Sequence, residues 1–250
     1  MKKISVEPVS LPRHPRAGGD PVFHVRLWIP APALSFVEGF AGMTLRTNIH
    51  YANKLLLALF TLLLTSPLSP ADDLQSSYTL EYYGKYTDAY ALGEKLTAEN
   101  PKEYFFALRA AWLAYLAGKY TRSLDLYQNA LLLKSDSLEP RLGQLLPLLA
   151  LGKYKQVEMT ALAILRTDPK NYTARIKLAY ALYLAGEFNR SEKYYADLEA
   201  DFPSDATVLM GLGWAQLKQS KKSAAQLQFN RVKVMFPDNK YADEALKWAK

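Results

Sequence analysis

The sequence repeats with a period of 34 residues, and this period restricts the chain to a stack of similar short units. Glycine recurs at Gly84, Gly118, Gly152 and Gly186, and the next step of the period lands on Ser220. An aromatic residue follows two positions later in four of the five units, and proline recurs on the same spacing near the end of four units. A period of this length indicates a repeat architecture, in which each unit buries its apolar face against its neighbours.

Each unit is predicted to contain two helices joined by a tight turn. Glycine adopts a left-handed backbone that ends the first helix, and proline cannot continue the second. Small residues recur where paired helices must approach closely: Ser77, Ala111, Ala179 and Gly213 in the first helices, and Ala89, Ser123, Ser191 and Ala225 in the second. A further apolar position follows seven residues after the second set, at Leu96, Ala130, Ile164, Leu198 and Val232. The sequence therefore predicts an all-α fold.

The pattern of glycine and an aromatic residue at the turn, with proline near the end, resembles the tetratricopeptide repeat. The resemblance covers five repeats, at residues 70–103, 104–137, 138–171, 172–205 and 206–239. It implies a right-handed α-α superhelical solenoid of antiparallel helix pairs. The last repeat departs from the pattern at its turn, where Ser220-Lys221-Lys222 replaces glycine-x-aromatic. Residues 240–250 are predicted to form a capping helix with the polar outer face that a terminal repeat element needs.

Residues 43–71 are predicted to be a bacterial signal peptide. Arg46, His50 and Lys54 form a basic start, the apolar run LLLALFTLLL follows over residues 55–64, and Ser69 and Ala71 occupy small-residue positions typical of a cleavage site. The apolar run would span about 15 Å as a helix, roughly half of a bilayer core. We therefore expect an exported, periplasmic protein, and the alternative is an uncleaved inner-membrane anchor with its domain facing the periplasm.

Residues 1–42 precede this signal and contain proline- and glycine-rich strings without a sustained helical or strand period. We hypothesise that translation starts at Met43 and that residues 1–42 are an artefact of gene prediction; the alternative is a disordered extension. The solenoid domain is expected over residues 72–250.

The residue inventory excludes several kinds of active site. The chain has no cysteine, and its three histidines, His14, His24 and His50, all precede the predicted domain. Histidine-dependent and thiol catalysis and most zinc sites are therefore excluded there, and no phosphate-binding glycine loop occurs. We predict a non-enzyme without cofactor or metal. The net charge of +7 falls to +3 beyond residue 71, where 24 basic residues face 21 acidic ones, so no nucleic acid is expected as a partner.

Helix geometry places the second, fifth, ninth and twelfth residues of each repeat on one face of the first helix. In the tetratricopeptide family, ligands usually lie in a concave groove that this face lines. The residues predicted to bind a partner in this groove are Leu108, Trp112, Tyr115, Leu142, Ile176, Tyr180, Tyr183, Met210 and Trp214. The alternative is structural filling, in which neighbouring repeats, a second copy or the chain's own end cover the face. Arg109, Arg141, Arg175 and Lys177 are expected to be solvated.

The apolar groove determines the predicted partner. The family's clamps for a C-terminal carboxylate place Lys and Asn at the fifth and ninth positions, which here are apolar or aromatic, so such a clamp is not expected. A hydrophobic peptide, an amphipathic helix or an unfolded envelope protein fits better. The predicted function is a non-catalytic protein–protein interaction scaffold or adaptor in the bacterial cell envelope. The alternative is a chaperone-like holdase for exported proteins. A membrane partner is expected only with an uncleaved signal, and self-association is left open.

Overall fold

A computed structural model describes residues 69–250 of the chain. These residues belong to one compact unit. The predictions for residues 1–42, and those for the signal peptide up to residue 68, lie outside the described part. None of the helices in the described part is long and apolar enough to cross a membrane.

Residues 69–250 form eleven α-helices, which follow one another as antiparallel pairs. The first helices of the pairs are α2 (Pro70–Tyr82), α4 (Tyr104–Leu116), α6 (Glu139–Ala150), α8 (Tyr172–Leu184) and α10 (Ala206–Lys218). The second helices are α3 (Tyr86–Glu99), α5 (Tyr120–Leu133), α7 (Tyr154–Thr167), α9 (Phe188–Asp201) and α11 (Lys222–Met235), and α12 (Lys240–Trp248) is a sixth first helix. The predicted pairs and final helix are confirmed.

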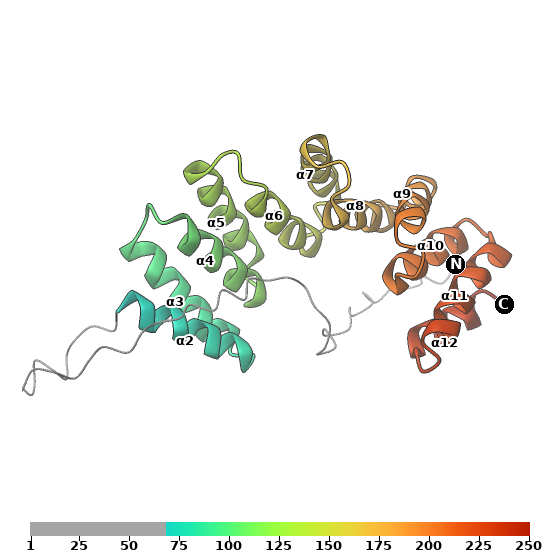
Figure 1. The fold of residues 1–250 in the computed structure, drawn as a ribbon, viewed down its shortest axis with the longest axis horizontal. Helices are drawn as coiled ribbons and strands as arrows, with labels where there is room; N and C mark the ends of the chain where they lie inside the picture. Colours follow the sequence, from blue (N-terminus) through green and yellow to red (C-terminus); the bar gives the residue numbers. More distant parts are fainter. Residues whose placement is uncertain (1–68) are drawn as a thin grey trace, which may run out of the picture. The chain divides into compact units, whose positions relative to one another are not determined.

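The helices stack in sequence order. Each helix packs against the next, and the first helices α4, α6, α8 and α10 also contact one another in turn. Figure 1 shows α6, α8 and α10 along one side of this row and α5, α7 and α9 along the other. The first helices α4, α6, α8 and α10 therefore lie next to one another along one side of the stack.

The five turns inside the pairs have the same left-handed backbone. The four predicted glycines have φ between +67° and +81°, and Ser220 takes the fifth place with φ +63°. The amide of the next residue then bonds back into the first helix, as Lys85 N does to the Leu80 carbonyl at 2.8 Å and Lys221 N to the Gln216 carbonyl at 3.0 Å. The serine turn keeps this geometry although a side chain makes it costly, by about 1–2 kcal/mol.

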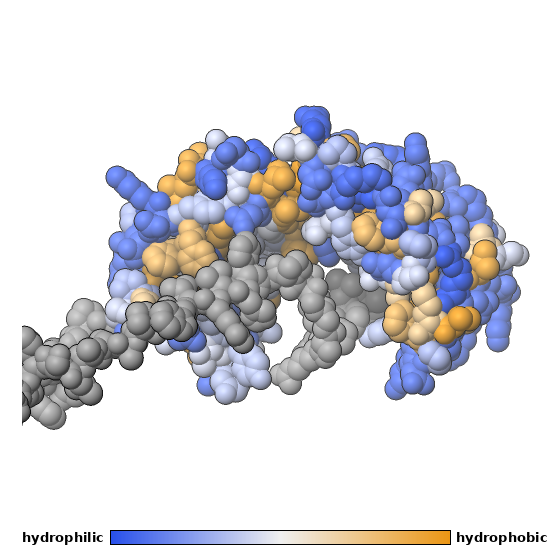
Figure 2. All heavy atoms as spheres, viewed as in Figure 1, coloured by the Kyte–Doolittle hydropathy of each residue, from blue (hydrophilic) through white to orange (hydrophobic). Residues whose placement is uncertain are grey.

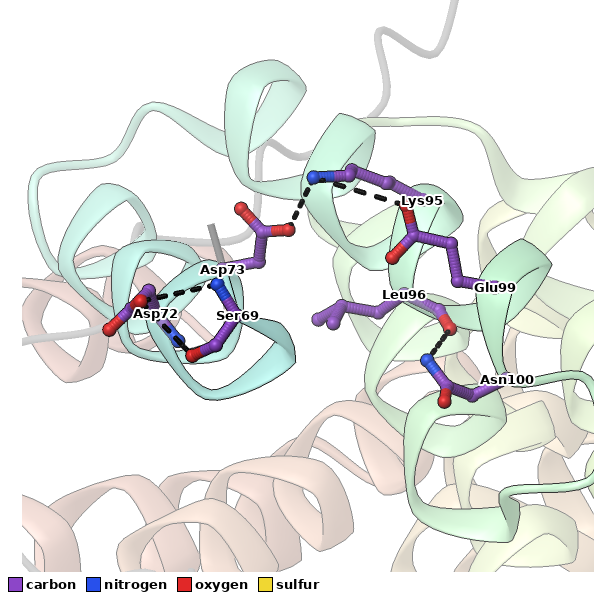
Figure 3. A network of polar contacts seen from close by, with 7 residues as sticks. All are labelled: Ser69, Asp72, Asp73, Lys95, Leu96, Glu99 and Asn100. Atoms are coloured by element: carbon purple, nitrogen blue, oxygen red, sulfur yellow. Dashed lines mark hydrogen bonds and ion pairs between the residues drawn. The ribbon is translucent and has the colours of Figure 1, made fainter. Parts of the chain in front are cut away.

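The first helix, α2, begins with a side-chain cap and an ion pair (Figure 3). Ser69 and Asp72 form a reciprocal capping box at its N-terminus. Asp73 is buried and accepts a hydrogen bond from Lys95 of α3 at 2.7 Å. The predicted cleavage after Ala71 lies inside α2, so it would remove Ser69 but leave the ion pair with Lys95 in place.

The structure agrees with the predicted close approach of small residues in four of the five pairs. All eight predicted positions are buried. At two of them a serine of the second helix donates to a carbonyl of the first: Ser123 Oγ to Ala111 O at 2.7 Å and Ser191 Oγ to Ala179 O at 2.9 Å. These bonds satisfy the hydroxyls at the point where the helices lie closest. The five predicted apolar positions near the ends of the second helices are all fully buried.

Successive repeats also interlock through aromatic rings placed on glycines. A Cβ atom added at Gly143 of α6 would lie 2.3 Å from the ring of Tyr127 of α5. A Cβ atom added at Gly211 of α10 would lie equally close to the ring of Tyr195 of α9. Only glycine leaves room for the ring at these two positions. Both tyrosines are almost fully buried as a result.

The capping helix α12 closes the apolar core at the C-terminal end. Ala242, Ala245 and Ala249 are fully buried, and Gln226 of α11 donates to the Ala249 carbonyl at 2.8 Å. The outer face is not uniformly polar as predicted, since Tyr241 is 54% exposed and Trp248 73% exposed. Tyr241 and Trp248 occupy the positions equivalent to the second and ninth residues of a repeat.

Candidate functional site

The nine residues predicted to bind a partner form one stripe along the first helices α4, α6, α8 and α10. We call this set the first-helix stripe: Leu108, Trp112, Tyr115, Leu142, Ile176, Tyr180, Tyr183, Met210 and Trp214. Eight of them are partly exposed. Ile176 is only 8% exposed and packs in a core cluster with Tyr195 and Leu212, so it offers little surface to a partner. The opposite, packing positions of the same helices, such as Leu145 and Leu178, are fully buried.

The stripe therefore differs from the core in accessibility. Figure 2 shows hydrophobic residues gathered along one face over α4 to α6 and again near α10 and α12. Leu146 and Tyr180, which occupy the ninth position of neighbouring repeats, are partly exposed, and neither is packed against a core cluster among the described residues. These side chains are available for a contact that the repeats themselves do not supply.

Aromatic neighbours hold several stripe residues in place. Trp112 packs on Tyr115 with ring centroids 5.7 Å apart, and Tyr115 in turn packs on Tyr120 at 5.8 Å. Trp214 lies 5.4 Å from the ring of Phe229 in α11. Such contacts fix the rings without covering them, which reduces the entropy lost when a partner binds.

The tyrosine hydroxyls of the stripe carry no charge near neutral pH. Burial raises the pKa of Tyr115, Tyr180 and Tyr183 above the ordinary tyrosine value. Each hydroxyl therefore serves as a neutral hydrogen-bond donor or acceptor. The middle of the stripe is apolar with a few neutral polar groups.

A polar cluster lies at the first-repeat end of the stripe, between α2 and α4. Arg109 donates through Nε to Ser77 Oγ at 3.2 Å and pairs through Nη1 with Glu81. Trp112 Nε1 donates to the other oxygen of Glu81 at 2.7 Å. The guanidinium carbon of Arg109 lies 3.9 Å from the ring centroid of Tyr78. One stripe residue, Trp112, is thus part of a network that links two repeats.

The expectation that the four basic residues of the first helices are solvated is wrong for two of them. Arg109 is 7% exposed and Arg175 is 8% exposed. Arg175 is paired with Asp201 at 2.5 Å and donates to the Asp197 carbonyl at 2.8 Å. Both arginines are buried because acidic residues of a neighbouring helix compensate their charge.

The sequence reasoning also missed Glu81. It occupies the twelfth position of the first repeat, where the later repeats have Tyr115, Leu149, Tyr183 and Leu217. Glu81 is the single acidic residue at a position that is apolar or aromatic in the other repeats. This departure was the signal in the sequence that a buried basic residue pairs with it.

A separate depression of about 570 Å³ lies among the turns rather than along the stripe. Its lining includes Lys153 and Tyr154 at the start of α7 and Glu187 before α9, and none of the nine stripe residues. Arg190 bridges two acidic residues at this place, Glu158 and Glu187. The two acidic residues of the depression are thus paired with Arg190, and the depression contains none of the exposed aromatic side chains of the stripe, so the stripe is the better candidate site. Within residues 69–250, no group of three or more His, Cys, Asp or Glu side chains is placed to hold a metal ion.

Comparisons with known proteins agree with this architecture. A family model described as Tetratricopeptide repeat matches residues 176–240, which span α8 to α11. No curated protein sequence matches the chain.

Several solved structures share the fold at low sequence identity. MamA from Desulfovibrio magneticus RS-1 has a TM-score of 0.61 and 14% identity, over 68% of this chain and 96% of that one. YrrB, described as a TPR protein with an unusual peptide-binding site, has a TM-score of 0.57 and 14% identity, over 72% of this chain and 92% of that one. A thermophilic TPR protein of Thermus thermophilus has a TM-score of 0.57 and 16% identity, over 72% of this chain and 98% of that one.

Proposed function

The described part of this chain consists of tetratricopeptide repeats, and from that premise we propose that the protein is a non-catalytic scaffold or adaptor of the bacterial cell envelope. It holds an apolar peptide or helix of another protein along the first-helix stripe. Tetratricopeptide repeats generally serve protein–protein interaction, which supports the coarse function. The partner's chemistry and the envelope location are proposals that rest on this chain's own residues.

The observation that carries the proposal is the partial exposure of an apolar stripe on successive first helices. Partly exposed rings such as Trp112, Tyr180 and Trp214 offer the aromatic anchors that dominate many protein interfaces. Covering apolar surface contributes about 25 cal/mol per Å². YrrB, which shares the fold, is described as having a peptide-binding site, and this supports a peptide as the class of partner.

A helical partner suits this surface better than an extended one. The backbone amides of α4, α6, α8 and α10 are bonded within their own helices, so the stripe presents no strand edge. An extended peptide would lose its backbone hydrogen bonds with water and regain few of them on an apolar surface. An amphipathic helix satisfies its own backbone and presents one apolar face.

The test of the stripe compares two double variants of the full chain. Leu146→Glu with Tyr180→Glu places charges on one stripe residue, Tyr180, and on Leu146, the partly exposed residue at the equivalent position of the preceding repeat. The control, Leu132→Glu with Met159→Glu, makes equivalent changes on second helices, where the two side chains are 77% and 64% exposed. A displayed library of random 18-residue peptides is selected on the unmodified chain, and the tightest peptide is titrated against all three proteins.

The stripe variant should lose at least tenfold in affinity, because a peptide would have to desolvate two carboxylates, while the control should bind as the unmodified chain does. Equal binding by all three proteins, with circular dichroism showing each folded, would place binding elsewhere. Failure to select any peptide would reject the proposal.

The envelope location has its own test. N-terminal sequencing of the protein from a periplasmic extract should show Asp72 as the first residue, if the signal is cleaved after Ala71. Recovery of the uncleaved chain from the membrane fraction would support the anchored alternative. Recovery from the cytoplasmic fraction alone would reject export.

A holdase for exported chains is the second candidate. The centre of the stripe and its neighbours, Leu142, Leu146 and Leu149, provide apolar contact without polar groups that would select one sequence. A holdase should bind several unrelated unfolded proteins with similar affinity and suppress their aggregation. A scaffold should prefer one partner by at least a hundredfold.

A further inference from the structure

One buried hydrogen-bond donor at the first-repeat end of the stripe has no partner. Arg109 is 7% exposed, and its Nη2 atom is inaccessible to solvent and unbonded. The other donors of the guanidinium are used, Nε by Ser77 and Nη1 by Glu81. A buried donor without an acceptor costs about 1–3 kcal/mol, so a ligand that supplies an acceptor would recover this free energy.

Tyr78 is the aromatic side chain that lies against this guanidinium. Its ring stacks on Arg109 at 3.9 Å and is itself 43% exposed. Tyr78 holds the ninth position of the first repeat and Arg109 the sixth position of the second. Access to Nη2 from the stripe would require this partly exposed ring to move away from Arg109.

The charge around Arg109 favours a neutral acceptor over an anion. Glu81 pairs with Nη1 and is itself bonded to Trp112 Nε1, so the charge of Arg109 is already compensated. A second carboxylate would bring an uncompensated negative charge into a partly buried site, which is costly. A carbonyl oxygen accepts the same hydrogen bond without this cost.

We propose that Arg109 and Tyr78 form a polar subsite that accepts a main-chain carbonyl from the last turn of a helix docked on the first-helix stripe. This inference rests on the proposed function. A helix leaves its last four carbonyls unpaired, so its C-terminal turn is the part that can offer a neutral main-chain acceptor. The docked helix therefore has its C-terminus at α2 and α4 and extends toward α10.

The length of the docked helix follows from the packing of the first helices. Neighbouring helix axes lie about 8–10 Å apart, so the three steps from α4 to α10 cover about 24–30 Å. At about 1.5 Å per residue this corresponds to roughly 16–20 residues. An 18-residue probe is therefore long enough to contact the subsite and Trp214 together.

The test uses the 18-residue peptide selected above, synthesised with a C-terminal amide. Arg109→Lys keeps a cation for Glu81 but removes the unpartnered Nη2 donor. The control is Arg122→Lys, an arginine of α5 that pairs with Glu94 at 3.0 Å and is half exposed. Arg109→Lys should weaken binding of the amidated peptide about tenfold or more, as expected for one charge-assisted hydrogen bond, whereas Arg122→Lys should leave it unchanged.

Orientation is read from a variant in which Trp112 is the only tryptophan, made by replacing Trp28, Trp214 and Trp248 with Phe. A nitroxide at the C-terminus of the peptide should quench Trp112 fluorescence strongly, and a nitroxide at its N-terminus should not. The reverse result would overturn the proposed direction.

The remaining outcomes separate this subsite from the function on which it rests. If the stripe variant abolishes binding but Arg109→Lys does not weaken it, the stripe binds peptides and the subsite is wrong. If the free-acid form of the peptide binds tenfold tighter than the amide, the site prefers a carboxylate and the neutral-acceptor proposal is overturned. If the stripe variant binds as the unmodified chain does, the proposed function and the subsite fail together.

Discussion

Tyr127 and Tyr195 show how single residues connect one repeat to the next. Each ring lies against a glycine of the following first helix, Gly143 or Gly211, and each tyrosine is at most 4% exposed. The equivalent positions of the intervening repeats hold Ala161 and Lys177, a small residue followed by a long one. Volume is thus conserved across these interfaces although the residues that supply it change, as close packing requires.

Gly211→Ala should destabilise the protein by about 1–3 kcal/mol, because the new Cβ atom would lie 2.3 Å from the ring of Tyr195. Urea unfolding monitored by circular dichroism measures the change. Tyr195→Leu combined with Gly211→Ala should recover part of the loss. Without the clash, the helix propensity of alanine would stabilise α10 by about 1 kcal/mol, so a stabilised Gly211→Ala protein would contradict the interlock.

Buried tyrosines should also make the protein sensitive to alkaline pH. Burial raises the pKa of Tyr127 and of Tyr195 well above the value of about 10 in the unfolded chain. The folded state therefore retains protons that the unfolded state loses, so this contribution is complete below pH ~10 and is lost as the pH rises further.

The free energy of unfolding between pH 9 and 11 should consequently fall less steeply in Tyr127→Phe with Tyr195→Phe than in the unmodified protein. Tyr82→Phe with Tyr83→Phe is the matched control, since those rings are 75% and 70% exposed. If the free energy of unfolding falls equally steeply with pH in Tyr127→Phe with Tyr195→Phe and in the unmodified protein, ionisation of these two hydroxyls is not coupled to unfolding.

At the scale of the element, each helix pair depends on its turn and on the cap of the next helix. Asn171, Asp205 and Asn239 cap α8, α10 and α12 through side-chain hydrogen bonds to their first turns. The helices α4 and α6 begin without such a bond. The first helices of repeats 4 and 5 are therefore better capped than those of repeats 2 and 3, although repeat 5 carries the unfavourable turn at Ser220.

Ser220→Gly should stabilise the last pair by about 1 kcal/mol, because glycine adopts the observed φ of +63° without a side-chain penalty. The reverse change at an equivalent turn, Gly186→Ser, should destabilise by a similar amount. Urea midpoints of the two variants should thus move in opposite directions. A shift in the same direction would mean that the turns contribute through something other than backbone strain.

The helix pairs could be predicted from the sequence because glycine, proline and the small residues recur in every repeat or nearly every repeat. The contact of Tyr127 with Gly143 could not be predicted from residues that recur in every repeat, because this contact recurs only in alternate repeats. The pairing of Glu81 with Arg109 joins residues of two first helices, and no local pattern fixes that distance. The exposure of the stripe likewise depends on how neighbouring side chains pack, and Ile176 shows how much this varies within one column.

For the 69–250 unit as a whole, the main contacts are between neighbouring helices, apart from those between successive first helices. Stability in such a stack is approximately a sum of local terms. No single core cluster extends from one end of the stack to the other among the described residues, since the buried residues separate into several groups.

Leu113→Ala should therefore destabilise one part of the stack far more than the rest. Leu113 is fully buried in α4, and truncating such a residue costs about 2–5 kcal/mol. Hydrogen exchange followed by mass spectrometry should show lost protection in α3, α4 and α5 and unchanged protection in α11 and α12. Equal loss throughout would indicate that the stack unfolds as one cooperative body.

Tyrosine-on-glycine contacts join repeat 2 to repeat 3 and repeat 4 to repeat 5, so they recur at every second junction between these repeats. Removing repeat 3 alone would bring Tyr127 against Lys177, where no space is left for a ring. Removing repeats 3 and 4 together would bring Tyr127 against Gly211, which already receives the ring of Tyr195. A chain shortened by two repeats would thus keep a ring against a glycine at the new junction, whereas a chain shortened by one repeat would not.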